Sequence, residues 1–462
     1  MKKLIGTKEF YKTVAALALP LLLQNAISTF VNLLDNLMVG RIGTESMSGV
    51  SIVNQLTFVF ALCLFGGTGG AGIFGAQFYG KGDQNGLRHT LRFNLVLSVG
   101  FTALACAALA AFQDFFIGAF LHEAESSGDL ALTLSEGKAY LKIMLWGLPG
   151  FALTTAYVGT LRVTGNNRLP MRASVAAIGV NLVFNYILIY GKLGFPALGV
   201  RGAAIATVMS RYVELFLILR GTHWAKEPPE YIHGLFRHFS IPGHLTWDII
   251  RRGLPLLVNE MFWSLGMTML TQCYSYRGLD AVAALNITST VTNLFNTVLF
   301  TMGIVAGIVI GNMLGAEEYD RARSASTHLM ALSFTACTLM GLSLLAAAPV
   351  APRFYNTTPE IMVLASRLMR VCAVMLPLNA LTNVEYWTIR AGGRTYITML
   401  FDSVFTWVVL VPLAWMLIHR TALPLLSVYI FVSSSEILKT IIGMVLVRKG
   451  IWVQNIVGSN AV

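Results

Sequence analysis

Apolar stretches long enough to form membrane-crossing helices recur along the whole chain, with short polar segments between them. Twelve can be recognised, near residues 14–38, 50–76, 91–113, 138–160, 170–190, 200–219, 252–275, 284–312, 326–349, 362–389, 397–418 and 423–447. A helix of about twenty residues crosses the roughly 30 Å hydrocarbon core of a bilayer, and lipid offers no partner to an unpaired backbone group. The pattern therefore predicts an all-α integral membrane protein with twelve transmembrane helices, surrounded by the lipid bilayer.

The chain also contains an internal duplication. Leu19–Arg88 aligns without a gap on Leu254–Arg323 at an offset of 235 residues, with 15 of 70 positions identical. A second match, at an offset of 228, relates Leu148–Gly165 to Leu376–Gly393. Such repeats are common in membrane transporters in which one half moves against the other.

The duplication predicts the domain organisation. We expect an N-terminal lobe over residues 1–220, a cytoplasmic linker over 221–251 and a C-terminal lobe over 252–462. Each half holds six spans, which is an even number, so both halves enter the membrane in the same direction. The two lobes are then parallel repeats, related by an axis along the membrane normal.

Composition and charge distribution agree with a membrane protein. Hydrophobic residues make up 55% of the 462 residues and charged residues only 12%, about half the share in soluble domains. The net charge of +11 could indicate nucleic-acid binding, but 21 of the 33 Lys and Arg lie in the tails and in the connections on one side, against seven in the opposite connections. This asymmetry predicts a multi-pass protein of the inner (plasma) membrane with both termini in the cytoplasm, and no nucleic-acid partner.

Sequence signatures of enzymes and of metal sites are absent. The five cysteines lie in or beside apolar spans without Cys-x-x-Cys spacing, and the four linker histidines have no cysteine nearby. No Walker sequence or Gly-x-Ser-x-Gly motif occurs, and the glycine-rich segment 66–75 lies inside an apolar span, where it favours close helix packing. We therefore expect no enzyme activity and no cofactor, and any uphill transport would use an ion gradient.

A carboxylate in the first span and polar residues in the fifth and sixth spans predict a cation site. Asp35 ends a polar stripe on one face of its helix, and a carboxylate within the bilayer is costly enough to need a function. The expected residues are Asp35, Asn181, Asn185 and Thr207. Their oxygens suit Na⁺, with Asp35 as its ligand, and the carboxyl could equally hold H⁺. The alternative is a protonated Asp35 that only joins helices through hydrogen bonds.

The second half differs at the corresponding position, which is Leu270. It has other polar residues, which we expect to line an acidic cavity for an organic cation or a second ion. These residues are Glu260, Asp402, Asn286, Asn293 and Glu385. The alternative for each one is a structural hydrogen bond between helices. The pairs Arg211–Glu214 and Glu436–Lys439 have i,i+3 spacing, which favours a structural interpretation because the two charges neutralise each other.

Prolines inside the spans predict where helices bend. Each removes one intrahelical hydrogen bond. Two repeat-related pairs occur, Pro20 with Pro255 and Pro149 with Pro377. Because the pairs recur in both halves, we expect bending to be part of the scaffold.

Several of these motifs together resemble the multidrug and toxic compound extrusion (MATE) family of transporters. They are Pro20 with Asp35 and Val39–Gly43; Gly72, Gln77 and Gly80–Asp83; Arg162 with Gly165 and Asn166; and the polar and glycine-rich block from Asn181 to Thr207. The resemblance covers essentially the whole chain. It implies two six-helix lobes around a central V-shaped cavity, and export of amphipathic, often cationic compounds in exchange for H⁺ or Na⁺.

The resemblance also carries the family's cation site onto Asp35, Asn181, position 185 and Thr207. Many members have a second acid where this chain has Asn185, so the site has one negative charge fewer, which favours H⁺ over Na⁺. Some members have a seventh-span acid, which Glu260 resembles.

We therefore expect a secondary active antiporter that exports amphipathic, cationic organic compounds or drugs by alternating access. Its partner is a small organic molecule, and we expect a monomer. The nearest alternative is a lipid-linked oligosaccharide flippase of the same superfamily, although the deep charges here are mostly acidic and do not suit a pyrophosphate. A passive channel or a membrane-embedded enzyme is a further alternative, which accumulation against a gradient or product formation would reveal.

Overall fold

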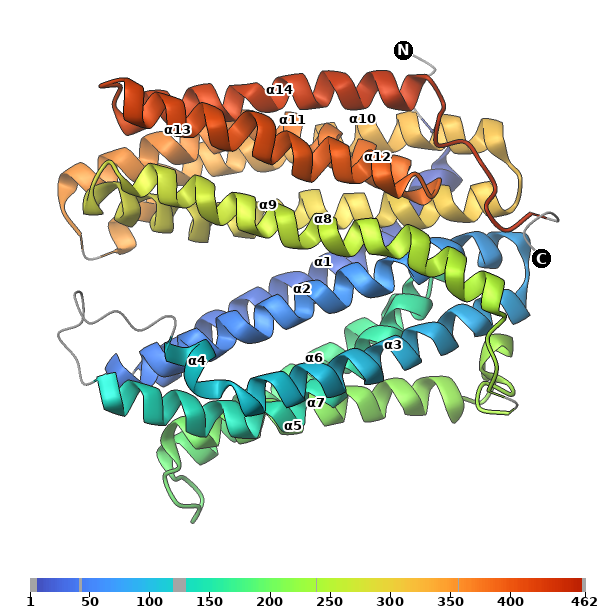
Figure 1. The fold of residues 1–462 in the computed structure, drawn as a ribbon, viewed down its shortest axis with the longest axis horizontal. Helices are drawn as coiled ribbons and strands as arrows, with labels where there is room; N and C mark the ends of the chain where they lie inside the picture. The colour runs from blue at the N-terminus through green and yellow to red at the C-terminus, as the bar shows by residue number, and fades with distance from the viewer. Residues whose placement is uncertain (1–5, 41–43, 119–129, 238, 356, 459–462) are drawn as a thin grey trace. The chain divides into compact units, whose positions relative to one another are not determined.

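The structure is a computed structural model that describes residues 6–40, 44–118, 130–237, 239–355 and 357–458, without the side chains of residues 30, 32–37, 39, 40, 44, 45 and 130. These residues are almost entirely helical (Figure 1). The predicted all-α fold is confirmed.

Twelve long helices occur in the described ranges, and each corresponds to one of the twelve predicted spans, with ends that differ by a few residues. The eleventh is divided into α12 and α13. Their bounds are α1 (Lys8–Gly40), α2 (Thr44–Lys81), α3 (Gln84–Ala111), α5 (Leu130–Val163), α6 (Arg168–Tyr190), α7 (Gly199–His223), α8 (Gly243–Ser275), α9 (Leu279–Gly315), α10 (Tyr319–Ala347), α11 (Pro359–Ala391), α12 (Thr395–Met399) with α13 (Val411–Arg420), and α14 (Leu425–Arg448). The short helices are α4 (Gln113–Gly118), η1 (Glu230–Ile232) and η2 (Ala351–Phe354).

Eleven segments of the described chain are both long and apolar enough to cross a membrane. The remaining long helix, α8, has 33 residues, which corresponds to about 50 Å. Its apolar stretch is interrupted by Asn259 and Glu260, which lower its mean hydropathy. Length therefore allows α8 to span the membrane, and its weaker apolar character comes in part from Glu260, which the sequence marks as a candidate for function.

The eleventh span contains two wide, π-helical turns between α12 and α13, over Leu400–Val404 and Thr406–Leu410. Pro412 lies two residues after the second of these turns and cannot donate a backbone hydrogen bond to it. Wide turns of this kind are frequent at functional sites. Asp402 lies in the first of them.

The chain folds into two compact units. Unit 1 contains Met1–Leu22, Ala76–Asp83 and Trp247–Val462, and unit 2 contains Leu23–Gly75 and Gln84–Thr246. In unit 1, α11 packs against α9, α10 and α14; in unit 2, α7 packs against α5 and α6. The helices α1 and α2 each contribute to both units. The lobe and linker boundaries drawn from the repeat stay a prediction.

Within unit 1, the end of α2 crosses the end of α9 at two glycines. A side chain at Gly80 would overlap the backbone of Asn312, and one at Gly315 would overlap the backbone of Gln77. Gly80 and Gly315 are repeat partners at the offset of 235, and so are Gln77 and Asn312. The duplicated sequence thus forms a reciprocal crossing in which each copy supplies the glycine on which the other packs.

The segment after α7 is attached to α3 in unit 2 by an arginine. The Arg92 guanidinium donates to the backbone carbonyls of Gly234, Leu235, Arg237 and Ser240, at 2.7–3.1 Å. The first part of the predicted linker is therefore a folded part of this unit.

Candidate functional site

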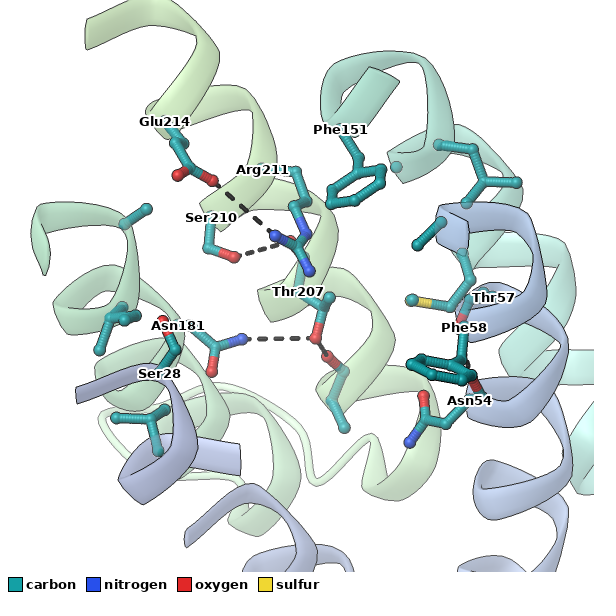
Figure 2. A pocket seen from close by; sticks show the side chains of 18 of the residues that line it. Ser28, Asn54, Thr57, Phe58, Phe151, Asn181, Thr207, Ser210, Arg211 and Glu214 are labelled. Carbon is teal, nitrogen blue, oxygen red and sulfur yellow. Dashed lines mark hydrogen bonds and ion pairs between the residues drawn. The ribbon is translucent and has the colours of Figure 1, made fainter. Parts of the chain in front are cut away.

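A cavity of about 520 Å³ lies within unit 2, between α1, α2, α5, α6 and α7. Figure 2 shows Asn54, Thr57 and Phe58 of α2 across this cavity from Asn181 of α6. Its lining combines aromatic and apolar side chains with amides, hydroxyls and one charged pair. The apolar part includes Phe58, Phe60, Met144, Leu148 and Phe151, and the polar part includes Ser28, Asn54, Thr57, Asn181, Asn185, Thr207, Ser210, Arg211 and Glu214. Such a lining suits an amphipathic molecule.

Three of the predicted cation-site residues meet at this cavity. The Asn181 amide donates to the Thr207 hydroxyl at 3.3 Å, and the Asn185 amide donates to the Asn181 carbonyl oxygen at 3.2 Å (Figure 2 shows the first of these bonds). Thr207 in turn donates to the Ala203 carbonyl, one turn earlier in α7, at 3.0 Å. The sequence pattern thus identified side chains that form one hydrogen-bonded chain. That they hold a cation stays a prediction.

The fourth predicted residue, Asp35, belongs to α1, but its side chain lies outside the described residues. The same helix contributes Ser28 and Val31 to the cavity lining. Val31 is one helical turn before Asp35.

Arg211 and Glu214 of α7 both line the cavity, so the pair is more than a surface ion pair. The Arg211 Nη1 lies 3.8 Å from the Glu214 Oε2, and the guanidinium lies 4.9 Å from the centre of the Phe151 ring. The Arg211 side chain is 41% exposed and that of Glu214 is 11% exposed. Because the contact is long, both charges stay able to interact with a molecule in the cavity.

A second polar cluster lies within unit 1 around Asp402. The Lys439 ammonium of α14 lies 2.7 Å from the Asp402 Oδ1, and the Asn259 amide of α8 donates to the Asp402 Oδ2 at 3.2 Å. The Ser403 hydroxyl donates to the Asn259 Oδ1 at 2.7 Å, which fixes the orientation of that amide. Glu436 Oε2 lies 3.9 Å from the same ammonium.

Glu260, one residue after Asn259, has a different cationic partner. Its Oε1 lies 3.9 Å from the Nη1 of Arg390 on α11. The Arg390 guanidinium also lies 4.5 Å from the centre of the Trp387 ring. The Asn259 amide, which donates to Asp402, also donates to the Tyr386 hydroxyl at 3.3 Å, and Tyr386 shares a side-chain hydrogen bond with Arg390. The two acids Glu260 and Asp402 therefore belong to one connected polar region.

The remaining predicted residues of the second half are not part of these contacts. Glu385 is fully buried, and within the described ranges neither of its carboxyl oxygens has a hydrogen-bond partner. It lies against Gly443 of α14. Asn286 and Asn293 are exposed on α9. The structure therefore brings Glu260 and Asp402 together but leaves these two asparagines apart, and the substrate or cation role of all five stays a prediction.

Sequence reasoning did not identify Lys439, Asn259, Arg390 and Tyr386 as parts of this region. Spacing paired Lys439 with Glu436, whereas its shorter contact is to Asp402, 37 residues earlier. The available signal was an ammonium in the middle of an apolar span, which needs a buried anion. Across the described residues, no group of three or more His, Cys, Asp or Glu side chains is arranged to hold a metal ion.

Comparison with known proteins gives one consistent result. The sequence model of the MatE family matches residues 20–187 and 255–416. The two matched segments begin at Pro20 and Pro255, which are repeat partners. The family pattern therefore occurs once in each half.

Named relatives cover nearly the whole chain. The "Probable multidrug resistance protein NorM" of Thermotoga maritima is 25% identical over 446 residues, which is 96% of this chain and 93% of that protein. The "Probable multidrug resistance protein YoeA" of Bacillus subtilis is 24% identical over 421 residues, 91% of this chain and 89% of that protein.

Solved structures share the fold. The "Outward-facing conformation of a multidrug resistance MATE family transporter of the MOP superfamily" has a TM-score of 0.86 at 22% identity and covers 97% of both chains. The "Crystal structure of MATE in the straight conformation" has a TM-score of 0.84 at 24% identity, again with 97% of both chains covered.

Proposed function

The chain belongs to the MatE family, and on this premise we propose that it is a secondary active antiporter that exports amphipathic organic compounds, cationic ones among them, in exchange for H⁺ or Na⁺. The cavity in unit 2 carries the proposal, because aromatic walls and a hydrogen-bonded polar chain meet in one place of suitable size. Two relatives named as probable multidrug resistance proteins support the same class of substrate. No observation favours the flippase alternative.

Asp35 binds the coupling ion in this proposal, together with Asn181, Asn185 and Thr207. Occupation of the site from outside bends α1 at Pro20 and releases the substrate, and loss of the ion to the cytoplasm resets the helix. The protein works as a monomer in the inner (plasma) membrane, with both termini in the cytoplasm. Charge neutralisation at Asp35 is what allows the polar face of α1 to move.

The hydrogen bonds of the polar chain support H⁺ over Na⁺. A Na⁺ ion needs several oxygen ligands directed at it, whereas the Asn181 carbonyl oxygen already accepts from Asn185 and the Thr207 oxygen accepts from Asn181. A proton needs only one carboxylate oxygen. Proton binding at Asp35 therefore requires less rearrangement of this chain.

The test is transport by purified protein in liposomes loaded with a fluorescent cationic dye. An imposed proton gradient and an imposed Na⁺ gradient are applied separately, with wild type and Asp35→Asn compared in each. We expect wild type to move the dye against its gradient with ΔpH, and Asp35→Asn to insert and fold normally but to lose at least about tenfold in rate. Gradient-driven efflux at the wild-type rate by the Asp35→Asn protein would disprove the role of Asp35.

A further inference from the structure

The cluster around Asp402 has the composition of a cation site, and its cation is a lysine of the chain itself. The Lys439 ammonium lies 2.7 Å from the Asp402 Oδ1 and 3.9 Å from the Glu436 Oε2. It also lies 5.6 Å and 5.9 Å from the ring centres of Phe401 and Phe405. Carboxylates and aromatic faces together are the surroundings that bind alkylammonium groups. The Lys439 side chain is only 9% exposed.

Three elements hold these groups around the ammonium. Asp402 and Phe401 come from the first π-helical turn of the eleventh span, and Phe405 lies between the two turns. The widened turns place the carboxylate and both rings on the side of α14. From α8, Asn259 donates to the second oxygen of Asp402, and Ser403 in turn fixes Asn259. The carboxylate is thus oriented by hydrogen bonds that do not depend on Lys439.

Charge balance makes the ammonium necessary. Asp402 and Glu436 carry two potential negative charges against the single positive charge of Lys439, in a region that is mostly screened from water. Removing one partner of a buried ion pair leaves an uncompensated charge, which is strongly destabilising. A site that has lost Lys439 would therefore attract another cation of similar size and donor geometry.

We propose that this cluster is a cation-binding site whose permanent occupant is the Lys439 ammonium, and that it binds a primary alkylammonium when the lysine side chain is removed. The built-in occupant makes the site independent of Na⁺. The lysine side chain already occupies the position between the two acids, so an organic cation cannot take the same position. The coupling ion then has to bind elsewhere, and this conclusion holds whichever compound the protein exports.

The experiment measures the thermal stability of the detergent-purified protein. Its outcome therefore does not depend on whether the protein transports a substrate. Wild type, Lys439→Ala and Lys439→Ala/Asp402→Asn are heated in equal concentrations of n-propylammonium, sodium or choline chloride. Propylammonium replaces the atoms that the alanine lacks, and choline controls for ionic strength because it has no N–H donor. Lys138→Ala is the matched control, since Lys138 pairs with Asp114 at a site where the aspartate is 69% exposed.

We expect any difference in wild-type Tm among the three salts to persist in Asp402→Asn, because it then arises outside this cluster. Lys439→Ala should unfold roughly 5 °C lower in choline, and propylammonium should restore most of that loss in a saturable manner. The double variant and Lys138→Ala should show no response to propylammonium. Equal stability of Lys439→Ala in propylammonium and choline, or equal rescue of the double variant, would overturn the proposal.

A measurement on wild type tests the proposal a second time, and this test does not depend on whether Lys439→Ala folds. A saturable rise in wild-type Tm with Na⁺ over choline, abolished by Asp402→Asn, would show that this cluster binds Na⁺ despite Lys439 and would refute the proposal. The same Tm in sodium and choline for both proteins supports it.

Discussion

Single charges within the unit 2 cavity decide which substrates it can hold. Of the lining residues whose side chains the structure describes, Arg211 and Glu214 are the two that carry a formal charge, and they lie 3.8 Å apart on adjacent turns of α7. Arg211 also covers the Phe151 ring, so an incoming aromatic cation would compete with the guanidinium for the same face. Removing either charge alone therefore changes the net charge of the cavity lining, and the two removals change it in opposite directions.

We predict that Arg211→Gln and Glu214→Gln have opposite effects on cationic substrates. Arg211→Gln leaves Glu214 uncompensated and should lower the KM for a cationic dye, whereas Glu214→Gln should raise it, each by roughly tenfold or less because the site is partly hydrated. Initial rates of dye export from liposomes measure both. A neutral amphipathic substrate serves as the control. A change of the KM for the cationic dye in the same direction in both variants would show that the substitutions act through folding.

The residue scale also shows where sequence reasoning stops. Asn181 and Asn185 could be assigned to one face because both lie on the same helix, and the fixed helical period links them. The partner of Lys439 could not be assigned, because Asp402 lies on another helix and the sequence does not give the rotation of one helix against another. The same limit applies to Glu260 and Arg390, which are separated by two spans.

At the scale of elements, the length of each apolar stretch predicts a helix, and small residues determine how closely the helices pack. All twelve predicted spans correspond to long helices of the described chain. The π-helical turns near Pro412 were not predictable from hydrophobicity, since a widened turn leaves the apolar pattern nearly unchanged. The crossing of α2 and α9 was not predictable either, because the repeat relates Gly80 to Gly315 without indicating that the two helices touch.

We predict that Gly80→Ala lowers stability because its methyl group would overlap the Asn312 backbone. Overpacking of this kind costs about 1–3 kcal/mol, measured as a lower Tm in detergent. Gly315→Ala should behave in the same way, because its methyl group would meet the Gln77 backbone.

The matched control is Gly72→Ala on the same helix α2, where an added methyl group meets nothing within 4 Å. This change should leave stability unaltered or raise it slightly, because alanine favours a helix over glycine. If Gly72→Ala lowered the Tm as much as Gly80→Ala, any alanine in α2 would be destabilising. The effect at Gly80 could then not be attributed to the crossing with α9.

At the scale of the whole molecule, the duplicated sequence and the compact units divide the chain differently. Unit 1 includes not only Trp247–Val462 but also Met1–Leu22 and Ala76–Asp83 from the first half. The core of unit 1 reflects this, since Val14, Leu17 and Leu21 of α1 are buried in one cluster with Val305 and Leu329. The second half of the sequence thus lacks part of its own core when it is separated from the first.

This arrangement predicts how the protein responds to being split. A cut between Ser240 and Ile241 leaves all four carbonyl contacts of Arg92 within the first fragment. Because Gln77 donates to the Ala391 carbonyl at 3.0 Å and accepts from the Ile456 backbone amide at 2.7 Å, the second fragment alone loses buried hydrogen bonds as well as apolar contacts.

We expect fragment 241–462 alone to aggregate in detergent, and co-expression with 1–240 to give a single monodisperse complex with dye transport. Size-exclusion chromatography followed by the liposome assay measures both. A monodisperse fragment 241–462 with the thermal stability of the complex would show that the contribution of α1 and α2 to unit 1 is dispensable.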